Sequence, residues 1–123
     1  MSTNIYKGLL GEEMAVAHLL KNGYTILEKN WRSQHLEIDI IASIEKTLVI
    51  IEVKLRVNDL FGRPEEFVSK QKQRNIIKAS SAYITQNDID FETRFDIISI
   101  IKNEKETKLD HIIQAFQPTV SKF

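Results

Sequence analysis

The stretch LVIIEVKL, residues 48–55, is apolar throughout except for Glu52 and Lys54. A run that is apolar on both faces is typical of a strand at the centre of a sheet whose two sides are both covered. A lone buried charge is costly, so Glu52 and Lys54 need an ion pair, a hydrogen bond or a bound metal ion. This stretch therefore predicts a central strand that carries a polar site.

The segments on either side of this strand predict an α/β fold. Apolar residues at helical spacing, followed by Gly23, predict a first helix, and Gly62 and Pro64 predict a loop before a second helix. The expected elements are a helix over 4–22, strands over 24–32, 36–43 and 48–56, a loop over 58–64, a helix over 65–84, and strands over 94–101 and 109–116. This order is αβββαβ with an extra strand at the end.

Asp39 and Glu52 are predicted to face each other across a hairpin. A tight turn centred on residues 45–46 places Asp39 opposite Glu52 and Glu37 opposite Lys54. Directly opposed side chains lie about 5 Å apart, where two carboxylates repel each other unless they share a proton or a cation. Oxygen ligands without histidine or cysteine suit Mg²⁺ or Mn²⁺. A structural ion-pair ladder, with Glu37 bound to Lys54 and Asp39 bound to a backbone amide, explains the spacing equally well.

Both predicted helices carry charged residues on the side that faces the core. On the second helix Lys72 interrupts an apolar stripe formed by Val68, Ile76, Ala79 and Tyr83. The remaining cations of that helix fall on the opposite, solvated face: Lys70, Arg74 and Lys78. On the first helix Glu12 and Glu13 fall on the apolar side. A snorkelling lysine and a helix-edge ion pair explain each case separately, but together with the strand charges they indicate a common site.

Length and composition favour a single cytoplasmic domain over residues 1–123. The chain of 123 residues is 42% hydrophobic and 28% charged, which is a globular composition. The absence of cysteine excludes disulfides and thiolate metal sites. The N-terminus has charges too early for a signal peptide, and no apolar run approaches the ~18 residues of a membrane helix, so no membrane partner is expected. With 17 basic and 17 acidic residues, nucleic-acid binding requires a local patch or bound metal ions.

Five sequence blocks, in order, resemble one protein family. The blocks GLLGEEMAVAHLL, LEIDIIA, LVIIEVKLR, FGRPEEFVSKQKQR and RFDII resemble those of the YraN-like family of uncharacterised bacterial proteins, and the match runs from about residue 8 to residue 116. That family in turn resembles the restriction-endonuclease-like superfamily with the PD-(D/E)xK motif, which includes Holliday-junction resolvases. The resemblance implies a three-layer core with a mixed central sheet flanked by helices. Leu36, in place of a usual glycine, and Ile38, in place of the motif's proline, depart from the pattern.

The resemblance implies an Mg²⁺- or Mn²⁺-dependent endonuclease that acts on DNA, branched or damaged. By position, Asp39, Glu52 and Lys54 match the motif, Glu12 matches a first-helix glutamate of resolvase-like members, and Lys72 matches a second-helix lysine. The implied metal ligands are Asp39, Glu52, the Val53 carbonyl and Glu12, and Lys54 would position the attacking water. The implied nucleic-acid rim consists of Arg56, Arg63, Lys72 and Arg74. Because resolvase-like proteins act as dimers, a homodimer is also expected.

Two other classes of function fit the same residues. One is a nucleic-acid-binding module that keeps the fold without turnover, and the other is a scaffold in which the sheet charges are only structural. The remaining polar residues are expected to be structural as well. Arg94 and Asp96 are predicted to form an ion pair within one strand, and the histidines, at no metal-ligand spacing, are expected to be ordinary surface or core residues: His18, His35 and His111.

Overall fold

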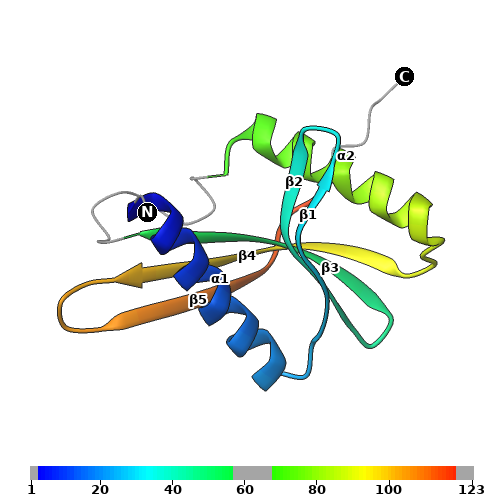
Figure 1. Cartoon of the computed structure of the whole chain (residues 1–123). Coiled ribbons are helices and arrows are strands. Elements are labelled where there is room, and N and C mark those ends of the chain that lie inside the picture. Colours follow the sequence, from blue (N-terminus) through cyan, green and yellow to red (C-terminus); the bar gives the residue numbers. More distant parts are fainter. Residues whose placement is uncertain (1–2, 57–67, 119–123) are drawn as a thin grey trace.

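In the part of the chain that the structure describes, five strands form a twisted sheet with two helices packed on it (Figure 1). A computed structural model describes residues 3–56 and 68–118, with side chains from residue 9 onward. The elements are α1 (Thr3–Lys21), β1 (Thr25–Ser33), β2 (Leu36–Ile44), β3 (Thr47–Arg56), α2 (Lys70–Asn87), β4 (Glu92–Lys102) and β5 (Thr107–Phe116). The predicted order of elements is confirmed, and each strand begins within two residues of its predicted start.

The strand β3 lies at the centre of the sheet, as its apolar sequence predicts. The spatial order is β1-β2-β3-β4-β5. Three of the neighbouring pairs are antiparallel and one, β3 with β4, is parallel. A parallel pair needs a crossover, and α2 lies in the connection between β3 and β4. The sheet is therefore mixed, as predicted.

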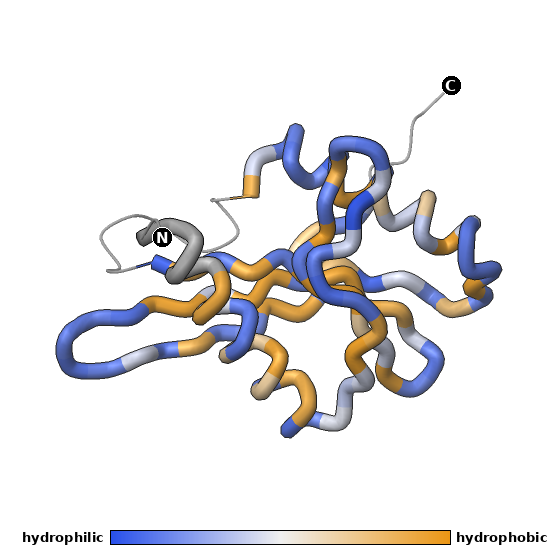
Figure 2. Tube along the Cα trace, viewed as in Figure 1, coloured by the Kyte–Doolittle hydropathy of each residue, from blue (hydrophilic) through white to orange (hydrophobic). Residues whose placement is uncertain are grey.

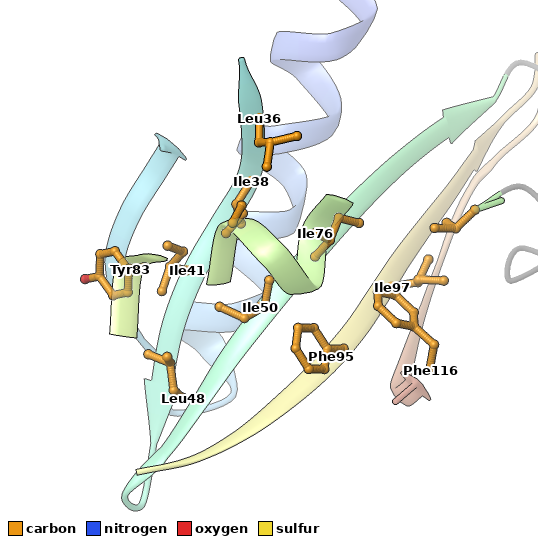
Figure 3. Close-up of a cluster of buried hydrophobic side chains, with 12 residues drawn as sticks. Leu36, Ile38, Ile41, Leu48, Ile50, Ile76, Tyr83, Phe95, Ile97 and Phe116 are labelled. Carbon is orange, nitrogen blue, oxygen red and sulfur yellow. The ribbon is translucent and has the colours of Figure 1, made fainter. Parts of the chain in front are cut away.

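The helices cover opposite faces of the sheet and make three layers. On the α1 side, Ala15 and Leu19 pack with sheet residues that include Ile40, Val49 and Ile51. The α2 side contains the larger cluster, whose labelled members in Figure 3 are Leu36, Ile38, Ile41, Leu48, Ile50, Ile76, Tyr83, Phe95, Ile97 and Phe116. Figure 2 shows the apolar residues concentrated in the middle of the sheet, between the helices. Within the described ranges, neither helix is long and apolar enough to cross a membrane.

The start of α2 differs from the prediction. The helix begins at Lys70 rather than at residue 65, because Ser69 adopts an extended backbone (φ −61°, ψ 161°) and caps the helix. The Ser69 hydroxyl accepts a hydrogen bond from the Lys72 amide at 3.1 Å, which satisfies one of the free N–H groups at a helix start. Residues 65–67 lie outside the described ranges. At the other end α2 continues to Asn87, where Asp88 takes the left-handed conformation with φ 52°.

The hairpin between β2 and β3 has the predicted turn and register. Glu45 and Lys46 both have positive φ, 45° and 63°, which is the backbone of a two-residue type I′ turn. The paired residues run from Ile44 with Thr47 to Ile40 with Ile51. Asp39 and Glu52 are the next residues on the two strands, so the turn places them at the end of this ladder.

The face alternation of β2 shifts at Asp39. Ile38 packs in the cluster on the α2 side, whereas Ile40 packs in the cluster on the α1 side. In a regular strand residues two apart share a face, so β2 is irregular between them. On β1, Asn30 lies between the partners of Ile38 and Ile40 and has a left-handed φ of 51°. The sheet is thus distorted at the level of the predicted acidic site.

Candidate active site

Asp39 and Glu52 come together at the end of the β2–β3 ladder. Glu52 is only 6% exposed and shares a hydrogen bond with the Asp39 carboxyl group. The Val53 N–H donates a hydrogen bond to Asp39 Oδ2 at 2.8 Å, which fixes the Asp39 side chain between the strands. The backbone contact of Asp39 is the one expected for a structural role, but the convergence of two carboxyl groups is not. An ion-pair ladder has no need for a second acid beside the first.

The shared hydrogen bond places a proton on Glu52. Burial, followed by the hydrogen bond and the charge of Asp39, raises the pKa of Glu52 from 4.5 to about 8. Lys72 and Lys54 act in the opposite direction but do not outweigh burial. At neutral pH the Glu52 carboxyl is therefore mostly protonated and donates to Asp39. Two carboxyl groups held this close share either a proton or a cation.

Lys72 is the cation that contacts Glu52 directly. Its Nζ lies 3.5 Å from Glu52 Oε2, and its side chain is 44% exposed while that of Glu52 is 7% exposed. The predicted inward position of Lys72 on α2 is thus observed, and this lysine extends from the solvent edge to the acidic pair. Lys54 lies two residues from Glu52 on the same strand face and close enough to lower the pKa of Glu52.

Glu12 approaches the acidic pair from α1. Burial and then the negative charge of Asp39 raise the pKa of Glu12, and a hydrogen bond from the Asn30 side chain lowers it. The preceding residue, Gly11, allows α1 to lie close to β3, because a Cβ at this position would be 3.2 Å from Leu55 Cβ. Even so, among the described residues no three acidic or histidine side chains are near enough to enclose a metal ion. Glu12 therefore stands beside the pair rather than within it.

Two residues that the sequence did not single out belong to this region. The Asn30 side chain, on β1, forms a hydrogen bond with Glu12. The backbone of Asn30 is left-handed, a conformation that asparagine tolerates better than most residues. Ser99 on β4 is the partner of Lys54 across the sheet, and strand alternation places it on the α2 side with Lys54. Its hydroxyl is buried and makes no hydrogen bond with the described residues. A serine inside an isoleucine-rich strand was the signal available in the sequence.

Glu37 and Glu13 do not lie as the sequence predicts. Glu37 pairs with Arg32 of β1 at 3.1 Å rather than with Lys54, because the β1–β2 register sets Arg32 directly opposite it. Glu13 is exposed and not on the core side of α1. Of the predicted basic rim, Arg56 is half-buried at the end of β3 and Arg63 lies outside the described residues. Arg74 is exposed and hydrogen-bonded to Gln71 Oε1 at 2.9 Å.

A separate polar network lies on the α1 side of β4. Arg94 Nη2 is 2.8 Å from Asp96 Oδ2, which confirms the predicted ion pair. His111 Nε2 also contacts Asp96 Oδ2, at 2.7 Å, and His111 Nδ1 contacts His18 Nε2 at 3.0 Å. Nothing in the sequence indicates that these two histidines are in contact, since they are 93 positions apart and come together only through the tertiary structure. Arg94 further donates to the Tyr24 hydroxyl at 2.6 Å.

Comparisons with known proteins give one family. Residues 11–100 match the family described as Uncharacterised protein family UPF0102. The UPF0102 protein FP2501 of Flavobacterium psychrophilum is 49% identical over 109 residues, which cover 89% of this chain and 92% of that protein. A UPF0102 protein of Bacteroides thetaiotaomicron is 46% identical over 111 residues, which cover 90% and 92%. One of Syntrophomonas wolfei is 40% identical over 110 residues, which cover 89% and 96%.

Among solved structures, one match is to Archaeoglobus fulgidus Hjc, a Holliday junction resolvase from an archaeal hyperthermophile. The identity is 17% and the TM-score 0.49, with 83% of this chain and 72% of that chain covered. The family match over residues 11–100 includes the acidic pair, both lysines beside it and Glu12.

Proposed function

This chain belongs to the protein family UPF0102, and we propose that it is a divalent-metal-dependent endonuclease that hydrolyses phosphodiester bonds in DNA. Membership confirms the family that the five sequence blocks indicate. The activity is our inference from the chemistry of the residues around Glu52 and from the PD-(D/E)xK resemblance of the EID and EVK blocks.

The observation that carries the proposal is the hydrogen bond between the buried Glu52 carboxyl group and the half-buried Asp39 carboxyl group, next to two lysines. The Glu52 carboxyl group is hydrogen-bonded to the Asp39 carboxyl group, and Lys72 Nζ is 3.5 Å from Glu52 Oε2. A packed hydrophobic side chain at position 52 would be less costly to bury than this acid. Strongly perturbed acids with specific charged partners cluster at functional sites. The arrangement supports a site that binds a cation.

A divalent cation fits the chemistry of this donor set. The Asp39, Glu52 and Glu12 carboxylates and the Val53 carbonyl offer only hard oxygen atoms, which Mg²⁺ and Mn²⁺ prefer. A cation in place of the shared proton would remove the repulsion between Asp39 and Glu52. When bound, such an ion acidifies a water molecule and stabilises the charge that develops on a phosphate. Because Glu12 stands beside the pair, it would bind directly only after a small movement and otherwise through water.

The lysines would act on the other side of Glu52. Lys72 would hold the ionised Glu52 carboxylate in place through their existing contact. Lys54, on the same strand face, would orient the attacking water toward the phosphorus. In hydrolysis the water oxygen bonds to phosphorus, one ester P–O bond breaks, and a proton passes from the water to solvent while the leaving oxygen takes one up.

A non-catalytic nucleic-acid-binding module is the second candidate. The contact between Asp39 and the Val53 amide favours it, because this hydrogen bond alone gives Asp39 a structural reason to be present. The two candidates differ in the need for Glu52. A binding module has no use for a buried acid beside a second carboxyl group, whereas a metal enzyme needs both carboxylates as ligands.

A cleavage assay on linear, single-stranded, flapped and four-way DNA, with Mg²⁺ or Mn²⁺, tests the proposal. Glu52→Gln keeps the size and the hydrogen-bonding capacity of the protonated acid but is a poor metal ligand. We expect it to lose more activity than the roughly 10- to 100-fold that removal of an outer-shell partner costs. Glu37→Gln, which removes a nearby carboxylate that is paired with Arg32, should retain activity.

Two outcomes would contradict the enzyme. One is the absence of cleavage of every substrate by the wild type with either metal, and the other is equal activity in the wild type and Glu52→Gln. DNA binding without cleavage would favour the binding module. The homodimer that the resemblance implies stays a prediction, and light scattering on the purified chain tests it.

A further inference from the structure

A groove runs along α2 on the side away from Glu52. Two adjoining hollows of about 450 Å³ and 540 Å³ share Lys70, Gln73 and Gln117 in their walls. One wall is α2 and the other is the end of β5 with the residues that follow it, as far as Pro118. The start of α2 opens into this groove, because Val68 and Ser69 also line it.

Among the residues that the structure describes, the walls of the groove carry positive charges and no negative charge. Lys70, Arg74 and Lys78 line it, and none of the described residues in its walls is acidic. All three are exposed and take part in no ion pair with the described residues. The whole of α2 contains four cations and no aspartate or glutamate. In a chain with a net charge of zero, this helix is a local positive patch.

The spacing of the three cations suits a chain of anions. They are four residues apart, so they lie on one side of α2 about 6 Å from one to the next along the axis. Free N–H groups and the helix dipole at the start of α2 add positive potential at the Lys70 end. Apolar atoms of Val68, Ile77 and Ala115 form part of the walls between the charges. A row of cations with apolar surface between them fits phosphates and the sugars that join them.

We propose that this groove binds the phosphodiester backbone of DNA that flanks the cleaved phosphate. The inference rests on the proposed function, because it assumes that one DNA substrate lies at Glu52 on one side of α2 and in the groove on the other side. Lys72 points to Glu52 from the same turn of α2 that presents Lys70 and Arg74 to the groove. Of the rim expected from the sequence, Arg74 lines this groove, and Lys70 and Lys78 are added to it. The assignment of Arg56, Arg63 and Lys72 to the rim stays a prediction.

The test compares two triple variants of equal charge change. The groove variant is Lys70→Gln, Arg74→Gln and Lys78→Gln. The control is Lys102→Gln, Lys105→Gln and Lys108→Gln in the β4–β5 hairpin, whose lysines are exposed as well and lie beside Glu104 and Glu106. Figure 1 shows this hairpin extending to the opposite end of the molecule from α2. Binding of a fluorescent DNA duplex is measured by anisotropy in EDTA over a series of KCl concentrations.

Loss of three phosphate contacts should lower the slope of log K against log salt by about 2 to 3 and weaken binding by about tenfold or more at moderate salt. The hairpin control should bind like the wild type. The proposal would be overturned if both variants bound DNA like the wild type. It would also be overturned if both bound more weakly than the wild type to the same extent. Circular dichroism confirms folding, and Lys70→Gln with Lys78→Gln, which leaves Arg74 bound to Gln71, repeats the test if the triple variant unfolds.

The failure of this proposal differs from the failure of the proposed function. Cleavage that needs Glu52, with unchanged DNA binding by the groove variant, would refute the groove and leave the enzyme. Groove-dependent binding by the wild type and by Glu52→Gln, with no cleavage of any substrate, would support the groove and refute the enzyme. An absence of DNA binding by the wild type would refute the groove.

Discussion

At the scale of single residues, the folded protein keeps Glu52 protonated at a pH where the unfolded chain would have it ionised. Without metal the folded protein keeps the Glu52 proton up to a pH of about 8, since its pKa is raised that far from the ordinary 4.5. The stabilisation that this proton gives is fully present below about pH 4.5 and is lost as the pH rises through about 8. Ionisation of Glu52 therefore destabilises the metal-free fold, a cost that is typical of functional sites.

Glu52→Gln should remove this loss, because glutamine keeps a donor toward Asp39 and has no charge to gain. In EDTA the free energy of unfolding of the variant should exceed that of the wild type by a margin that grows between about pH 5 and 8, up to a few kcal/mol on the order-of-magnitude scale of such shifts. Urea unfolding at stepped pH measures the margin. Glu37→Gln is the control, and a margin that stays constant with pH would contradict the assignment.

Mg²⁺ should stabilise the protein more strongly at higher pH, because the ion has to displace the Glu52 proton. Below about pH 8 the apparent affinity should fall by up to about tenfold per pH unit. Lys72→Met should move this dependence to higher pH, since the Lys72 charge lowers the pKa of Glu52. Thermal unfolding with and without Mg²⁺ measures the effect. Lys78→Met, on the same helix but in the groove, should leave the profile unchanged, and a pH-independent shift would refute proton displacement.

At the scale of elements, the β2–β3 hairpin sets the geometry of the site. Its turn has two residues with positive φ, and neither Glu45 nor Lys46 is a residue type that favours that region. The hairpin nevertheless keeps the register that places Asp39 next to Glu52, because the apolar faces of both strands are buried and a slip by one residue would expose them. Packing, and not the turn sequence, therefore determines the register.

Glu45→Asn combined with Lys46→Gly should stabilise the protein without changing the site. Both residues tolerate left-handed backbone, and the pair Asn-Gly is the favoured sequence of a type I′ turn. We expect a gain on the order of 1 kcal/mol in the free energy of unfolding, measured with urea. The reversed order, Glu45→Gly with Lys46→Asn, serves as a comparison with a smaller gain. Destabilisation by the Asn-Gly variant would show that the turn is not under backbone strain.

The polar parts of the elements were harder to predict from sequence than their order. The order follows from apolar spacing, and β3 could be placed at the centre because both of its faces are apolar. Serine is a favoured helix N-cap, so Ser69 could have marked the start of α2. The prediction placed the start earlier because the apolar stripe extends back to Val68. The pairing of Glu37 with Arg32 depended on the β1–β2 register, which includes an irregularity between Ile26 and Glu28 that no residue pattern reveals.

At the scale of the whole molecule, the Asp96 network joins the α1 layer to the strands β4 and β5. Asp96 is fully buried, and hydrogen bonds from His111, Arg94 and the Gln114 amide outweigh burial and lower its pKa. Burial, followed by the charges of His111 and Lys21, lowers the pKa of His18. Such a network could not be predicted from sequence, because its members come from three elements and only the complete tertiary structure places them together.

Acidification should weaken the fold in two steps. A histidine with a lowered pKa is protonated more readily in the unfolded chain, so its contribution to stability is lost as the pH falls below about 6.5. The contribution of Asp96 is present above about pH 3.8 and is lost at lower pH. His18→Gln, which keeps an N–H for His111, should abolish the first step and keep the second, as measured by urea unfolding against pH. The exposed His35→Gln is the control, and a first step that persists in His18→Gln would refute the assignment.

The one parallel pair of the sheet has a kinetic consequence. The strands β1, β2 and β3 are consecutive in sequence and adjacent in the sheet, and so are β4 and β5. Each of these two sets can therefore pair starting from its own short turns. Joining the two sets requires closure of the long segment that contains α2, and closing such a segment is the slow, entropically costly event in a chain of this topology. On this topology the Asp39 and Glu52 carboxyl groups can meet as soon as the β2–β3 hairpin forms, whereas Lys72 reaches them only when α2 packs on the sheet.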